Sequence, residues 1–224
     1  MKWIGKGYDC YAAPLGVVFR KICSTNDSYS LFDGYSTQEI AREDYWKAVI
    51  GLAYKKILPQ LGYDPGSVAR DESGNVVTCY YQEDIVRVFD QEGQLRGKFA
   101  PVEPASAIYS VARYGENIWC AVPVDMAVYL YSPNGTLLQT LGSPFEEESE
   151  LSYPEHVSVY GGELYISDMG HRRVAKWNPI QRKLQTYKLF EEPVWEWNHV
   201  NSLQCSVVRL ESGIYLEEQT RRLA

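Results

Sequence analysis

The chain has 224 residues, of which 45% are hydrophobic and 23% charged, and its formal net charge is −7 with a pI near 5.1. These are the values of a soluble globular protein, and the length suits one undivided all-β domain. An acidic chain of this kind is not expected to carry the clustered Lys and Arg of a polyanion site, which argues against nucleic acid as a partner.

Membrane spans, secretory signals and the cysteine spacings of metal sites each have a recognisable sequence pattern. No apolar run approaches the ~18 residues that span a membrane. We expect no secretory signal, because Asp9, Arg20 and Lys21 interrupt the apolar residues near the start. The five cysteines are odd in number and lack a CxxC or Cys/His metal spacing. We therefore expect reduced thiols and a cytoplasmic protein.

The first predicted repeat lies at 14–34, "PLGVVFRKICSTNDSYSLFDG". A glycine precedes an apolar strand, and a second strand ends in an aromatic residue sixteen positions after Gly16, at Phe32. Short alternating runs bounded by Gly, Asn and Asp are typical of β-strands and turns.

The next segment, 36–62, has a helical pattern. Ser36 and Glu39 form a capping-box signature, and apolar residues recur at helical spacing from Ile40 to Ala53. Basic residues then precede Pro59. The pattern predicts one inserted amphipathic helix over about 36–61. Its role is open between packing across a face or rim of the fold and acting as a lid or partner-docking element.

Three stretches after the helix repeat one template: 73–95, 115–138 and 161–184. Each opens with a glycine turn, continues with an apolar strand and a polar break, and ends a second strand in an aromatic residue. These aromatics, Phe89, Tyr131 and Trp177, are 42 and 46 residues apart, and an acidic insertion (145–150) lies in the longer interval.

Another alternating run precedes each glycine, at 66–72, 107–114 and 156–161, so each repeat contains four short strands. Repeats of this length are typical of β-propeller blades. The last stretch, 212–224, matches the start of the template and stops before its outermost strand. Met1–Ile4 or Tyr29–Asp33 could supply that strand, because an unpaired edge is a liability.

The predicted fold is therefore an all-β propeller of four or five four-stranded blades, one domain over 1–224. The stretch 154–179 resembles the NHL repeat, whose slots are filled by Pro154, Gly162, Tyr165, Ile166, Asp168, Arg173 and Trp177. The stretch from Pro65 keeps Gly74, Asn75 and Arg87 but has Tyr80 where the family often has Asp. The resemblance implies a propeller. It leaves function open, because relatives include protein-, RNA- and sugar-binding propellers as well as metal-dependent lactonases and lyases.

Asp168, His171, Arg172 and Arg173 form the densest polar cluster in the sequence. We interpret it as structural: the Asp accepts backbone N–H groups across its turn, and the arginines pair with carboxylates of a neighbouring blade. Arg221 and Arg222 recur at the matching place of the last repeat.

A metal site is a second hypothesis. His156 begins an innermost strand and His199 lies near the start of the next repeat, so the two could meet at one channel mouth with Glu155, Asn198 or Asn201. Glu155, His156 and His199 are thus candidate ligands of a divalent metal. Against this, the alignment places Gly66 and Ala107 where His156 stands, so no third histidine is offered.

Trp195 and Trp197 alternate about Glu196, so both should project to the same side of an extended segment. They either pack in the core or form a stacking platform for a sugar ring or a partner side chain.

We expect non-catalytic recognition of a protein or small ligand at one ring face or channel mouth, with Trp195, Trp197, His156 and His199 as candidate ligand-binding residues. The alternatives are a metal-dependent lactonase- or lyase-like enzyme using Glu155, His156 and His199, and a carbohydrate-binding propeller. No GxSxG, P-loop, HExxH or GxGxxG motif occurs, so no catalytic residue is assigned. No cofactor is expected beyond the metal of the enzyme alternative.

Overall fold

The structure of the protein is a computed structural model. It describes residues 8–13, 16–21, 28–32, 37–63, 65–71, 73–80, 82–101, 107–142, 150–160, 162–168, 170–171, 173–188, 207–210, 213–216 and 222–223. The chain forms two compact units, a terminal unit of Met1–Gly51 with Glu191–Ala224 and a central unit of Leu52–Phe190. The single domain over 1–224 stays a prediction. No helix among these residues is long and apolar enough to cross a membrane.

The terminal unit holds two antiparallel sheets. One has the order β1 (Tyr8–Ala13), β2 (Gly16–Lys21), β3 (Ser28–Phe32), β4 (Thr37–Ile40), and the other has β17 (Val207–Leu210), β18 (Gly213–Leu216), β19 (Arg222–Leu223). Since β3 is hydrogen-bonded to both β2 and β4, the strand predicted at 29–33 belongs to this sheet and does not complete the last repeat. Met1–Ile4 lies outside the described residues.

The single predicted helix is wrong in its extent. Thr37–Ile40 is β4, and two short helices follow, α1 (Arg42–Ile50) and α2 (Tyr54–Leu61). Glu39 pairs with Ser30 in the sheet, so the capping box predicted at 36–39 does not form. Gly51 then ends α1 with a φ of 86°, a conformation that favours glycine. The segment with the helical spacing does form helix, but strand β4 replaces its first residues and Gly51 separates α1 from α2.

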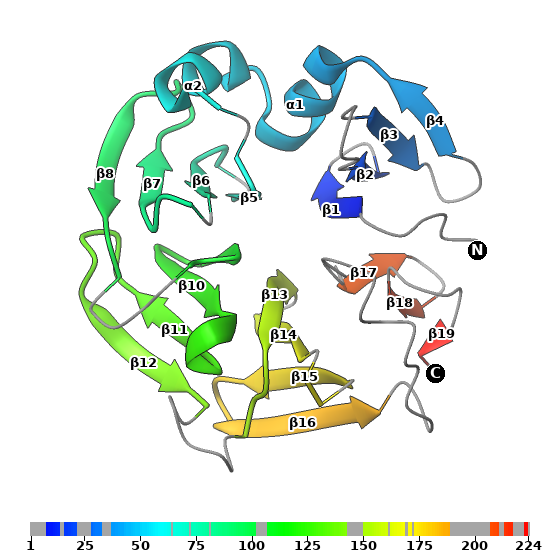
Figure 1. Cartoon of the computed structure of the whole chain (residues 1–224), viewed down its shortest axis with the longest axis vertical. Helices are drawn as coiled ribbons and strands as arrows, with labels where there is room; N and C mark the ends of the chain where they lie inside the picture. Colours follow the sequence, from blue (N-terminus) through cyan, green and yellow to red (C-terminus); the bar gives the residue numbers. More distant parts are fainter. Residues whose placement is uncertain are drawn as a thin grey trace. The chain divides into compact units, whose positions relative to one another are not determined.

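The central unit is built from three four-stranded antiparallel sheets, each in chain order. They are β5 (Ser67–Arg70), β6 (Val76–Cys79), β7 (Val86–Phe89) and β8 (Leu95–Phe99); β9 (Ser110–Tyr114), β10 (Asn117–Val122), β11 (Ala127–Tyr131) and β12 (Leu137–Leu141), with a 3₁₀ turn η1 (Pro123–Asp125); and β13 (Pro154–Tyr160), β14 (Glu163–Asp168), β15 (Arg173–Asn178) and β16 (Lys183–Lys188). The first strand of each sheet is innermost, with β9 beside both β5 and β13, and the last strand is outermost (Figure 1). Radiating sheets of this kind are propeller blades.

The predicted equivalence of the three strand-ending aromatics is confirmed. Phe89 pairs with Val76, and Tyr131 and Trp177 make the same pairing in their own sheets, with Ile118 and Leu164. All three aromatic side chains are buried. Their spacing in the sequence therefore marks one position of a repeated structural unit.

The middle sheet of the central unit is buried on both faces. On β10, Ile118, Cys120 and Val122 belong to the hydrophobic cluster shared with β5–β8. The alternate residues Trp119 and Ala121 belong to the cluster shared with β13–β16. Alternate side chains of one strand thus enter two different hydrophobic clusters, one on each face of the sheet, as expected where sheets stack face to face.

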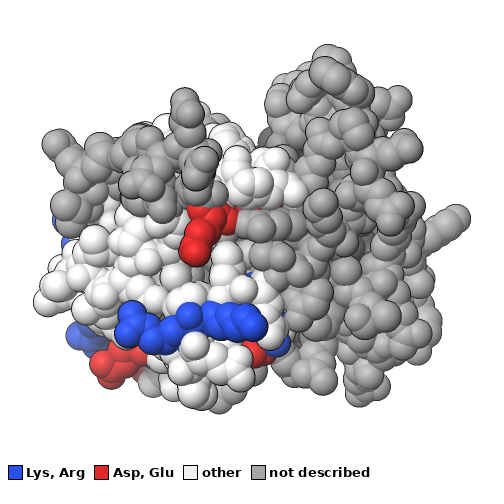
Figure 2. Space-filling view, turned by 90° about the horizontal axis from the view of Figure 1, so that it is seen from below, with Lys and Arg blue, Asp and Glu red and all other residues white. Residues whose placement is uncertain are grey.

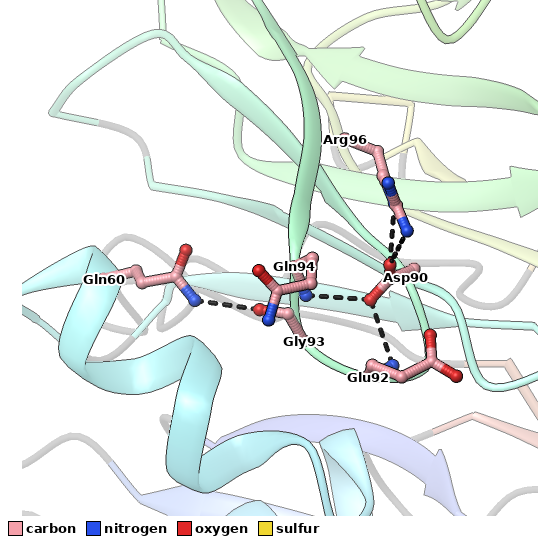
Figure 3. Close-up of polar contacts among 6 residues, drawn as sticks. All are labelled: Gln60, Asp90, Glu92, Gly93, Gln94 and Arg96. Atoms are coloured by element: carbon pink, nitrogen blue, oxygen red, sulfur yellow. Dashed lines mark hydrogen bonds and ion pairs between the residues drawn. The ribbon is translucent and has the colours of Figure 1, made fainter.

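In the first two sheets of the central unit, the turn before the outermost strand contacts the element that precedes the sheet. A Cβ added to Gly135, in the β11–β12 turn, would meet Phe99 Cβ of β8 at 2.6 Å. A Cβ added to Gly93, in the β7–β8 turn, would meet Lys56 Cβ of α2 at 3.0 Å. Gln60 also donates from Nε2 to the Gly93 carbonyl at 2.9 Å (Figure 3). The turn of the first sheet thus packs on α2, whereas the turn of the second sheet packs on the outer strand β8. This supports the packing role for the helix.

Candidate binding face

One end of each sheet in the central unit carries the loop before the first strand and the loop between the second and third strands. In an antiparallel meander the start of the first strand lies beside the end of the second and the start of the third. The described residues within 63–67, 80–85, 107–110, 123–126, 152–156 and 168–171 therefore gather at this end, which we call the loop face. Loops on a rigid scaffold are where proteins most often carry binding residues.

A row of polar side chains crosses the three innermost strands just inside this face. Ser67, Ser110 and His156 are equivalent, since they pair with Cys79, Ala121 and Ser167 of the second strands. Ser110 Oγ lies 3.4 Å from Ser67 Oγ and 2.9 Å from His156 Nδ1. The alignment that placed Gly66 and Ala107 opposite His156 is therefore wrong by one and three residues.

The row connects neighbouring sheets. Val111 donates its backbone N–H to Ser67 Oγ at 3.1 Å, and Val157 donates to Ser110 Oγ at 3.2 Å, one sheet further on. Burial lowers the pKa of His156 to about 4, so its ring is neutral near pH 7. His156 is thus the third member of a repeated structural position.

The preceding position does not repeat: it holds Gly66, Tyr109 and Glu155 in the three sheets. Gly66 and Tyr109 each donate their backbone N–H to the second strand, to Cys79 and Ala121, at 3.0 Å. Between Pro154 and His156 the register shifts by one residue, so Glu155 is the extra residue of a β-bulge. Bulges re-aim a side chain and occur next to functional sites. The Glu155 side chain is buried, with 2% of the residue exposed.

Tyr153 has an unusual backbone. Its φ is 59°, and the equivalent Ala107 has a φ of 54°. This left-handed conformation is rare for a bulky residue and marks strain of about 1 to 3 kcal/mol where the surroundings impose it. The residue is nevertheless 39% exposed, so core packing does not account for a tyrosine here.

Hydrogen bonds on both sides of Ser152 impose this conformation. Ser152 N–H donates to Asp168 Oδ1 at 2.7 Å, and Gly170 N–H donates to the Ser152 carbonyl at 2.6 Å. Asp168 is fully buried, and its Oδ2 lies 2.9 Å from His171 Nδ1. The loop before β13 is thus fixed to the loop after β14, which holds Tyr153 in place.

The Tyr153 ring meets a second tyrosine. The ring centroids of Tyr109 and Tyr153 lie 6.3 Å apart at an interplanar angle of 81°, an edge-to-face pair. Burial raises the pKa of the Tyr153 hydroxyl well above its usual range, with contributions from a hydrogen bond to Tyr109 and from the charge of Glu155. The two rings and the carboxylate therefore form one cluster.

A second tyrosine pair on the loop face is fully engaged by protein groups. The Tyr63 ring stacks on Tyr80 with centroids 4.6 Å apart. Tyr63 donates its hydroxyl to Glu83 Oε2 at 2.5 Å and accepts from Arg87 Nη1 at 2.8 Å, while Arg87 and Glu83 form an ion pair at 2.7 Å. This network ties the chain after α2 to the β6–β7 loop, which is a structural role.

Charge is mixed on the surface of the central unit. Lys and Arg side chains form a row beside Asp and Glu, and much of the described surface between them is uncharged (Figure 2). Lys176 pairs with Glu163 at 2.6 Å and Arg113 with Asp71 at 3.0 Å. These two basic side chains are therefore paired with carboxylates.

The predicted polar cluster is partly as expected. Asp168 does accept a backbone N–H, that of Ser152, which lies before β13. His171 pairs with Asp168. Arg172 lies outside the described residues, and Arg173 is placed only by its backbone, at the start of β15.

The remaining predicted site residues divide by where they lie. Glu155 and His156 are adjacent and buried in β13, whereas Trp195, Trp197 and His199 lie outside the described residues. Within the part of the chain that the structure describes, no group of three or more His, Cys, Asp and Glu could hold a metal ion. The site of Glu155, His156 and His199 therefore stays a prediction.

Sequence reasoning missed Tyr109 and Tyr153. The available signal was the register of the repeat: once Ser67, Ser110 and His156 are aligned, the position before them is seen to change from sheet to sheet. The register is hidden in the sequence because the turn between the first two strands is longer in the first sheet, at 71–75, than in the second, at 115–116.

No protein-family model and no curated protein matches the chain. Among solved structures, it is similar to a protein of unknown function from Bacteroides caccae, with a TM-score of 0.52, 13% identity and coverage of 95% of this chain and 72% of that one. It is also similar to streptogramin B lyase, with a TM-score of 0.48, 11% identity and coverage of 83% of this chain.

A further similar structure is a chain of a nidogen/laminin complex, with a TM-score of 0.46, 14% identity and coverage of 77% of this chain and 59% of that one. The protein spans about half the length of the lyase, 55%. At these identities the likeness concerns the fold alone. The β-propeller blades are assigned from the sheets of the central unit, and the finer likeness to the NHL repeat stays a prediction.

Proposed function

We propose that the protein is a non-catalytic binding module that recognises a small ligand or a partner's side chain at the loop face of the central unit. Tyr109, Tyr153 and Glu155 are the proposed contact residues. Partner identity follows from these side chains and not from the fold, because propellers serve both enzymes and binding proteins.

One observation carries the proposal: the exposed tyrosine held in a strained backbone. Tyr153 is 39% exposed at a φ of 59°, and bonds on both sides of Ser152 fix its backbone. The left-handed backbone recurs at Ala107 and so belongs to the repeat; what is particular to this sheet is the large, exposed side chain at that position. A rigid, partly exposed aromatic ring contributes binding area at low entropic cost.

The same repeat supplies matched substitutions for the test. Tyr153→Ala installs the residue that the neighbouring sheet has at the equivalent position, Ala107, with nearly the same φ. Tyr114→Ala is the control, since Tyr114 is a partly buried tyrosine at the opposite end of β9.

The experiment is a saturation-transfer NMR screen with four fragment classes: amines, carboxylates, sugars and blocked amino acids. We expect at least one class to bind wild type and Tyr114→Ala and to lose its signal with Tyr153→Ala. If every class gives equal signals for wild type and Tyr153→Ala, the loop face is not the binding site and the proposal fails.

A further inference from the structure

The geometry of the Tyr109–Tyr153 pair indicates what kind of group it can receive. The rings are nearly perpendicular, at 81°, with centroids 6.3 Å apart. Such a pair forms a corner in which a ligand can lie against the π-face of one ring and beside the other. Aromatic π-faces carry partial negative charge and attract cations within about 6 Å of the ring centroid.

A carboxylate adds negative charge to this corner. Glu155 follows Tyr153 by two residues and sits in the bulge of β13, with only 2% of the residue exposed. Its charge acts on the Tyr153 hydroxyl, where it adds to burial and the Tyr109 hydrogen bond in raising the pKa of that group. A carboxylate at low exposure is screened weakly by solvent, so its charge adds to the attraction of the rings for a cation.

Anions and neutral rings fit this arrangement less well. An anion would meet two π-systems and a carboxylate, all of the same sign. A neutral sugar ring would gain no Coulomb attraction from the Glu155 carboxylate. The formal net charge of −7 also favours the approach of cations over anions.

We propose that Tyr109, Tyr153 and Glu155 form a binding site for a cationic group, an ammonium or a guanidinium. The inference rests on the proposed function and names its ligand class. Two sources present this chemistry, a free small amine and the Lys or Arg side chain of a peptide, and the experiment separates them.

The first arm titrates the intact chain with tetramethylammonium chloride at constant ionic strength, with NaCl as the reference salt, and follows saturation transfer to the methyl protons. The second arm uses a blocked hexalysine peptide. Tyr153→Ala is expected to weaken binding about tenfold, and Glu155→Gln by about threefold to tenfold, because each removes one attractive partner of the cation. Tyr114→Ala should bind like wild type.

Each outcome decides. Binding of tetramethylammonium that Tyr153→Ala and Glu155→Gln weaken supports the site with a small amine as a sufficient ligand. Binding of the peptide alone, with the same two losses, supports the site and assigns the cation to a polypeptide. No binding in either arm, or binding that neither variant changes, overturns the inference. In that case a Tyr153-dependent signal from another fragment class would leave the proposed function standing, and its absence would remove both.

Glu155→Gln keeps the inference testable if Tyr153→Ala lowers stability. The amide preserves the size of the side chain and removes only its charge. Urea unfolding of both variants, measured before the titrations, ensures that the compared proteins are folded.

Discussion

At the scale of single residues, the central unit divides into positions that repeat and positions that do not. Ser67, Ser110 and His156 occupy one position and hold neighbouring sheets together. Immediately before them, Gly66, Tyr109 and Glu155 share a position but no chemistry. A repeated position is explained by the fold, so the positions that vary are where ligand recognition is to be sought.

The repeat makes His156→Ser an informative substitution. The pKa of His156 is about 4 in the folded chain and near 6.5 when exposed, so the unfolded state takes up a proton first as the pH falls. The histidine therefore gives its full stability above pH 6.5, and roughly 3 kcal/mol is lost between pH 6.5 and 4. Serine does not titrate, so we expect the free energy of unfolding of His156→Ser to depend less on pH in this window.

Urea unfolding of both proteins at pH 7.5, 6.5, 5.5 and 4.5 measures this difference. Carboxylates such as Glu83 and Glu163, whose pKa values are lowered by Tyr63 and Lys176 respectively, titrate in both proteins and cancel in the comparison. Parallel pH profiles for the two proteins would show that His156 is not held neutral.

Gly170→Ala tests the support of Tyr153. A Cβ at this position would overlap the Ser152 side chain, coming within 2.7 Å of Ser152 Cβ, so the two loops must separate. We expect a loss of about 1 to 3 kcal/mol in the free energy of unfolding, together with weaker binding at the loop face. Gly66→Ala is the control, because its Cβ would meet Tyr80 at an ordinary 3.5 Å. Equal urea midpoints for the two variants would contradict the account.

At the scale of elements, the outer turns carry a second repeated device. Asp90 Oδ1 accepts the backbone N–H groups of Glu92 and Gln94 at 3.0 and 2.8 Å (Figure 3). At the corresponding turns of the next two sheets, Ser132 Oγ accepts the backbone N–H of Thr136, and Asn178 Oδ1 accepts those of Ile180 and Gln181. These side chains satisfy the turn and set the start of each outer strand.

Asp90→Asn and Asp90→Ala separate the acceptor from the charge. The amide oxygen of Asn can accept two backbone N–H groups of its turn, as Asn178 does in the third sheet, whereas Ala cannot. We expect the urea midpoint to fall clearly for Asp90→Ala and to stay near wild type for Asp90→Asn. A midpoint for Asn as low as that for Ala would show that the ion pair of Asp90 with Arg96, and not the turn, is what matters.

Elements were predictable where a pattern repeats and less so where it does not. The spacing of Phe89, Tyr131 and Trp177 located equivalent strands in three sheets, because each aromatic fills the same buried place. The helix was overextended because its apolar period runs through β4 and through Gly51. The pairing of β4 with β3 depends on residues outside the segment, so the spacing of apolar residues within the segment does not reveal it.

At the scale of the whole molecule, the candidate site could not be predicted from the sequence, because long-range contacts place its residues. Its residues come from two sheets, and Tyr153 is placed by a left-handed backbone, a bulge and two hydrogen bonds to β14 and the loop after it. None of these is encoded by a local motif. The predicted Trp195, Trp197 and His199 lie outside the described residues, so their part in binding stays a prediction.

The central claim is that ligand binds at the loop face of the central unit, and amide chemical-shift mapping tests it most directly. The ¹⁵N-labelled chain would be titrated with the best fragment from the screen, or with tetramethylammonium. The account predicts perturbed amides at 107–111, 152–157 and 168–171, and quiet amides at the opposite end of the same sheets, around 114–117. Perturbations gathered at the opposite end, or none in the central unit at saturating ligand, would contradict it.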